Sequence, residues 1–142
     1  MQSPQMKQLA KQLRKGLSPA RLGAYELAVG QQRTAYRVGN FIIKENTGPY
    51  YSDAIKVTAY NRPTSNILAQ WAKHRCRYAY EVLAGDWIVQ VYTAPLGEKR
   101  KLQQYCARYD AVVGIGDAYF YDLHSKNIGI DRTTDWLVVF DF

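Results

Sequence analysis

Three polar side chains near the end of the sequence have the types and spacing of a cation-binding site. Asp122 and Asn127 lie five residues apart in an expected loop, and Asp141 follows an apolar run at positions 136–140. Carboxylate and amide oxygens are ligands that magnesium accepts, and a carboxylate can also take a proton from a hydroxyl. The pattern D-x-x-x-x-N is also common in surface loops with Asx turns. The other motifs of the chain are needed to distinguish a cation-binding site from a surface turn.

The pattern around these residues resembles the protein-kinase-like superfamily, in which a catalytic loop D-x-x-x-x-N is followed by a hairpin and D-F. Asp122, Asn127 and Asp141-Phe142 match these motifs. The tripeptide Asp-Leu-His that begins at Asp122 is similar to the aminoglycoside-phosphotransferase and the phage or bacterial branches. The resemblance implies that Asp122 orients or deprotonates the acceptor hydroxyl. It also implies that Asn127 and Asp141 hold magnesium against the phosphates of ATP.

The first half of the chain carries further motifs of this family. Residues 30–38 stand in the place of the phosphate-covering loop, where Gly30 is the one expected glycine that remains. Residues 41–44 resemble the motif V-A-I-K of the third strand. The resemblance therefore implies that Lys44 is catalytic and binds the α- and β-phosphates.

Residues 90–94 correspond to the interlobe connector of the family, whose backbone contacts adenine. Gln90 and Tyr92 are therefore expected to bind the nucleotide together with Gly30 and Lys44. The family order of lysine, helix, strand pair, connector, helix, catalytic loop, hairpin and D-F runs through about 118 residues of the chain. This agreement in order is stronger evidence than any single motif.

The expected helix after Pro63 lacks the glutamate with which the family's lysine pairs. No acidic residue occurs from residue 63 to residue 77, and Asn66 or Gln70 is the best substitute. A neutral amide gives a weaker hydrogen bond than a carboxylate, about 1 kcal/mol against roughly 1.5–3 kcal/mol. Lys44 is therefore expected to be held less firmly than in the family.

The periodicity predicts an α+β fold, a truncated bilobal kinase-like domain with an antiparallel sheet in its first lobe. Helices are expected from Pro4, after Pro63 and around 102–113, and strands at 25–29, 34–38, 41–45, 80–83, 87–92, 118–120, 128–130 and 136–140. The single domain 1–142 is expected to contain a helical extension (1–22), an N-lobe (23–92), a hinge (93–97) and a minimal C-lobe of helix plus hairpin (98–142). The sequence reaches only Asp-Phe, so this C-lobe is expected to lack a peptide-substrate platform.

The composition indicates a folded chain with an uneven charge. Of its 142 residues, 47% are hydrophobic and 13% are aromatic. Residues 1–109 carry 17 basic and 6 acidic side chains, which gives +11, and residues 110–142 carry 2 and 6, which gives −4. The basic part favours an acidic partner, whereas the acidic part, which contains the three oxygen ligands, favours a cation.

The sequence also predicts the cellular location of the protein. No run of about 18 apolar residues and no signal-peptide pattern occurs, so we expect a cytoplasmic protein without a membrane partner. Two cysteines are too few for a disulfide framework, and Cys76 and Cys106 are expected as small core residues.

Two functions from different classes fit these features. One is a minimal atypical kinase of serine/threonine type that binds Mg-ATP and transfers phosphate to a hydroxyl on a protein partner. The other is a catalytically inactive pseudokinase that acts as a binding protein, such as a phage or mobile-element inhibitor of a host factor. Nucleic-acid binding through the basic run at 98–101, a small-molecule kinase, and oligomerisation through the truncated C-lobe are weaker alternatives.

Overall fold

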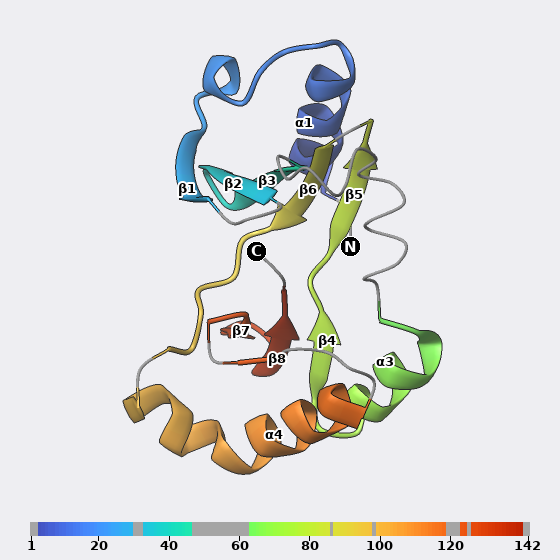
Figure 1. Ribbon diagram of the computed structural model, residues 1–142, viewed down its shortest axis with the longest axis vertical. Coiled ribbons are helices and arrows are strands. Elements are labelled where there is room, and N and C mark those ends of the chain that lie inside the picture. The colour runs from blue at the N-terminus through green and yellow to red at the C-terminus, as the bar shows by residue number, and fades with distance from the viewer. Residues whose placement is uncertain are drawn as a thin grey trace. The chain divides into compact units, whose positions relative to one another are not determined.

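The computed structural model describes residues 3–29, 33–46, 63–85, 87–97, 99–118, 123–124 and 126–140. They form a mixed α+β structure, as predicted, and the chain divides into two compact units (Figure 1). The first unit consists of Met1–Arg62, Tyr80–Tyr92 and Phe142, and the second of Pro63–Ala79 and Thr93–Asp141. None of the helices in the described residues is long and apolar enough to cross a membrane.

The first unit is built on a five-stranded antiparallel sheet. Its strand order is β1-β2-β3-β6-β5, so two hairpin-connected groups meet where β3 pairs with β6. The strands are β1 (Tyr25–Val29), β2 (Arg33–Val38), β3 (Phe41–Asn46), β5 (Glu81–Ala84) and β6 (Trp87–Val91). These bounds confirm the strands predicted in residues 25–45 and 80–92 to within two residues.

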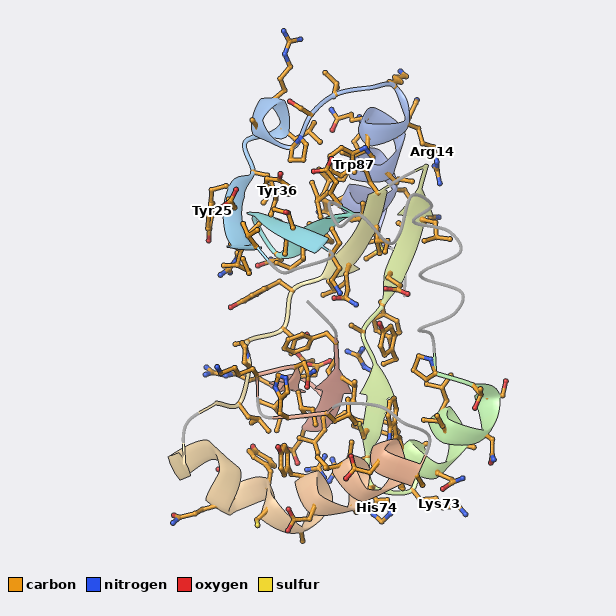
Figure 2. All side chains as sticks on the ribbon, viewed as in Figure 1. Arg14, Tyr25, Tyr36, Lys73, His74 and Trp87 are labelled. Atoms are coloured by element: carbon orange, nitrogen blue, oxygen red, sulfur yellow. The ribbon has the colours of Figure 1, made fainter. Side chains whose placement is uncertain are left out.

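Helix α1 (Pro4–Arg14) covers one face of this sheet (Figure 1). The Ser3 hydroxyl caps it by accepting a hydrogen bond from the Met6 N–H at 3.2 Å, and Pro4 stands in its first turn, as predicted. Its apolar stripe packs on three buried residues of the sheet. The contact is formed by Met6, Ala10 and Leu13 of the helix with Ile43, Ala84 and Val89 of the sheet. Tyr36 and Trp87, labelled in Figure 2, pack against the same cluster.

The opposite face of the sheet carries Lys44. Successive side chains of a strand point to opposite faces, and Ile43 faces α1, so Lys44 points away from the helix. The cross-strand partners of Lys44 are Ala35 on β2 and Ile88 on β6. Together with Ile42 and Gln90 they form what we call the Lys44 face, and all five residues are at most 2% exposed.

The second unit combines two helices with a small mixed sheet. Helix α3 (Ser65–Ala72) is capped by Thr64, whose hydroxyl accepts from the Ile67 N–H at 3.3 Å. The other elements are β4 (Cys76–Tyr78), α4 (Lys99–Ala118), β7 (Ile128–Asp131) and β8 (Trp136–Val139). Strand β8 lies between β7, to which it is antiparallel, and β4, to which it is parallel.

Helix α3 packs into the core of the second unit. Ile67 and Trp71 of α3 are buried against Val112 of α4 and Leu137 of β8, and the Trp71 indole N–H donates to the Val112 carbonyl at 3.3 Å. The sequence analysis placed residues 63–79 in the N-lobe, whereas these contacts group them with the second unit.

Three local predictions in the second unit are wrong. Helix α4 continues through its glycines to Ala118, which the sequence suggested as the first residue of a strand; residues 119–120 of that strand lie outside the described residues. Strand β4 was not predicted, because it pairs only with a strand some 60 residues later. Cys76 is buried as predicted, but Cys106 is exposed.

Candidate functional site

Lys44 is the most deeply buried cation of the described residues. Its side chain belongs to β3, between β2 and β6, and the residue is 1% exposed. Lysine is almost never buried to this extent unless its ammonium group has polar or anionic neighbours, because desolvation disfavours the charge. Its apolar neighbours Ala35, Ile42 and Ile88 are equally inaccessible. The sequence placed Lys44 in a strand, and this part of the prediction is confirmed.

Gln90 lies on the same face, diagonally across from Lys44. It pairs with Ile42 on β3 and with Glu81 on β5, and it is 1% exposed. Its Nε2 donates to Glu81 Oε2 at 3.3 Å. The side chain therefore has a defined orientation, in which the amide nitrogen faces the outer strand β5.

Tyr92 follows β6 and is held by two contacts within the first unit. Its N–H donates to the Asn40 carbonyl at 2.7 Å, and the Arg37 guanidinium lies 3.7 Å from the centre of its ring. The preceding N–H, that of Val91, donates to the Tyr80 carbonyl at 2.9 Å. Two N–H groups of this predicted adenine-binding segment therefore donate hydrogen bonds within the first unit.

The expected hinge, residues 93–97, is fastened to the hairpin of the second unit. Pro95 forms a bridge with Gly129 of β7, and the Leu96 N–H donates to the Ile128 carbonyl at 2.8 Å. A Cβ atom on Gly129 would overlap the Ala94 carbonyl oxygen and would stand 2.7 Å from Thr93 Cγ2. A glycine is required here because the two backbones approach so closely.

Asn127 is buried in the second unit and organises the loop that precedes β7. Its Oδ1 accepts from the His124 N–H at 2.9 Å, and its own N–H donates to the His124 carbonyl at 3.0 Å. The Phe140 N–H donates to the Asn127 carbonyl at 2.9 Å, which joins this loop to the end of β8. An amide oxygen has two lone pairs, so Oδ1 can accept this bond and still offer a ligand to a cation.

His124 is a hydrogen-bonded residue of the same loop. Its Nδ1 accepts from the Lys126 N–H at 3.2 Å. This hydrogen bond supports the turn.

Three predicted site residues, Gly30, Asp122 and Asp141, lie outside the described residues. Within the described residues, no three His, Cys, Asp or Glu side chains gather as a metal site. Lys44, Gln90 and Tyr92 share the first unit, whereas Asn127 belongs to the second. The predicted roles of Lys44 and Asp122 in catalysis, of Gly30, Gln90 and Tyr92 in nucleotide binding, and of Asn127 and Asp141 in metal binding therefore remain predictions.

The proposed substitutes for the helix glutamate bond to one another. Gln70 Nε2 donates to Asn66 Oδ1 at 3.3 Å, one helical turn apart on α3. Both residues are on the helix whose core contacts lie in the second unit.

A surface groove of the first unit lies away from the Lys44 face. Its volume is about 940 Å³, and it is lined by the start of α1, by the β2–β3 turn at residues 38–41 and by Val91. None of the predicted site residues lines it.

Glu81 is a polar residue of this region that the sequence analysis did not single out. A signal for it was present, because Gly85 marks the end of one β-rich run and the hairpin pairs Ala84 with Trp87. Counting back along the hairpin from that pair places Glu81 opposite Gln90.

A comparison with models of known protein families gives no match, and a comparison with curated proteins gives none either.

Proposed function

We propose that this protein is a minimal kinase-like protein that binds Mg-ATP and transfers phosphate to a hydroxyl, most simply on a protein partner. The observation that carries the proposal is the buried Lys44 on the face of the sheet opposite α1. A buried ammonium costs stability, and such a cost is typical of a group kept for binding an anion.

The neighbours of Lys44 suit a nucleotide. Ala35, Ile42 and Ile88 surround it with buried apolar side chains, and the amide of Gln90 is a directed polar group on the same face. A few polar groups among apolar side chains are the usual composition of a small-molecule site. Lys44 would contribute the positive charge for the phosphates.

The oxygen ligands of the second unit suit magnesium by their chemistry. Asn127 is buried in an ordered loop, and the family resemblance adds the carboxylates of Asp122 and Asp141. Magnesium would neutralise the phosphate charge, while Asp122 would orient the attacking hydroxyl and accept its proton.

The catalytically inactive alternative is favoured by one observation. Asn66 and Gln70, the expected substitutes for the glutamate that pairs with Lys44, bond to each other. In that case the kinase-like features would serve binding to a protein rather than phosphate transfer.

The proposal is tested by thermal unfolding with and without Mg-ATP. A ligand that binds only the folded state should raise the Tm by about 5–10 °C at one hundred times its Kd. Lys44→Met should abolish this rise, measured against the ligand-free Tm of the variant itself, because it removes the positive charge for the phosphates. Lys11→Met, an exposed change on α1, is the matched control and should keep the rise.

A second arm separates the two candidate functions. In the parent, γ-phosphate should be released or transferred from Mg-ATP, and Asp122→Ala should remove this activity without removing the thermal shift. A thermal shift with no transfer to any protein from the source cell would favour the inactive binding protein. The absence of both, at millimolar Mg-ATP, would contradict the proposed function.

A further inference from the structure

We infer that Glu81 is the positioning residue for Lys44, in place of the glutamate that α3 does not supply. The inference deepens the proposed function and rests on it for the role of Lys44 toward phosphate. Its evidence is the arrangement of charges on the two faces of the first unit.

The described residues of the first unit contain three carboxylates, and only Glu81 is on the side of Lys44. Glu45 is adjacent to Lys44 in β3, so it points to the α1 side, where the Tyr36 hydroxyl donates to it at 3.3 Å. Glu26 pairs with Tyr36 and belongs to that side as well. Glu81 pairs with Gln90 and, through it, with Ile42, which places it on the Lys44 face.

The distance between the two strands suits an interaction of long side chains. Glu81 and Lys44 are separated by two strand spacings and by two residues along the strands. These steps correspond to about 10 Å across the sheet and about 7 Å along it. Lysine and glutamate have the two long side chains that such a diagonal requires, and Gln90 occupies the position between them.

The orientation of the Gln90 amide agrees with this role. Because its Nε2 donates to Glu81, its Oε1 is directed to the other side of the amide, where an acceptor suits a cation. Gln90 is buried, so its amide keeps the orientation that the hydrogen bond to Glu81 gives it. Arg37, which is on the same side of the sheet, stacks on Tyr92 and donates to the Gly39 carbonyl.

The inference is tested by a double-mutant cycle on the free protein. Glu81→Gln should raise the equilibrium constant for unfolding about tenfold in the parent, because it removes a carboxylate that stabilises the buried ammonium. In the Lys44→Met background the same change should have less than about a twofold effect. Glu45→Gln is the matched control, since it removes the same charge one residue away on the opposite face, and its effect should be equal in both backgrounds.

Two further measurements separate positioning from a merely structural role. The pKa of the Lys44 ammonium, followed by NMR, should fall in Glu81→Gln, because a nearby carboxylate favours the charged lysine, and should not fall in Glu45→Gln. The inference is contradicted if the double-mutant cycle shows no coupling between Glu81 and Lys44, or if the pKa of Lys44 is the same in Glu81→Gln as in the parent. Mg-ATP binding is scored separately: coupling without nucleotide binding would refute the proposed function alone, and nucleotide binding without coupling would refute the role of Glu81 alone.

Discussion

Gly129 of β7 lies directly against the Ala94 carbonyl of the expected hinge, with no room for a side chain between the two backbones. Gly129→Ala should therefore lower the free energy of unfolding by about 2 kcal/mol or more, because the hinge must move away from β7. Urea unfolding measures this loss. Gly114→Ala on α4, where a Cβ meets nothing within 4 Å, is the control and should stabilise by roughly 0.5–1 kcal/mol. A stabilising effect of both changes would show that this contact is not tight.

Arg108 of α4 joins two residues with left-handed backbones. Its guanidinium donates to the carbonyls of His74, Arg75 and Asp135, and Arg75 and Asp135 have φ of 54° and 60°. Arg108→Lys should destabilise by about 1–3 kcal/mol although it keeps the charge, because an ammonium cannot reproduce the planar fork that binds three carbonyls. If Arg108→Lys unfolds at the urea concentration of the parent, the hydrogen-bond fork does not contribute to stability.

Asp131 makes the second unit sensitive to acid. Burial by itself raises the pKa of Asp131, but hydrogen bonds from the Arg77 guanidinium and the Thr133 N–H outweigh it and hold the pKa below its usual range. The stabilisation is therefore fully present above the ordinary carboxyl pKa and is lost as the pH falls through the lowered value. Asp131→Asn should reduce the loss of stability between pH 5 and pH 2, by about 1 kcal/mol.

Unfolding by urea at several pH values gives this comparison. Asp117→Asn, an exposed change on α4, should retain the acid sensitivity of the parent. Parallel pH profiles for the parent and Asp131→Asn would rule out the Asp131 contribution.

The two cysteines should react at very different rates. Burial raises the pKa of the Cys76 thiol to about 12, so this group should resist iodoacetamide in the folded protein. Cys106 is exposed, and its hydrogen bond to Asp110 raises its pKa. Mass spectrometry at pH 8 should find modification at Cys106 alone, and Asp110→Asn should accelerate it. A slower reaction in Asp110→Asn would contradict the assigned cause.

The strands of the first unit were predictable because their signals are local. Alternation of side chains and the turns at Gly39 and Gly85 fix each hairpin within a few residues, and so Lys44 could be placed on a strand. Its burial followed from pairing with β6, which lies more than 40 residues later in the chain and has no local signature.

The errors arose where packing overrides spacing. Cys106 was expected on the buried face of α4, but it is six residues from the buried Val112, a rotation of about 240° around the helix. Tyr105 and Tyr109, seven and three residues away from Val112, pack on the core instead. The contact of α3 with β8 and the parallel β4–β8 pair depend on long-range packing, which periodicity does not reveal.

The central claim is that a nucleotide binds on the Lys44 face, and an NMR titration of the parent with Mg-ATP tests it most directly. The account predicts saturable shifts of the amide signals of Ile42, Lys44 and Gln90, with little change at Met6 and Ala10 of α1, and their loss in Lys44→Met. Unchanged signals on the Lys44 face at millimolar Mg-ATP, or shifts confined to α1, would contradict it.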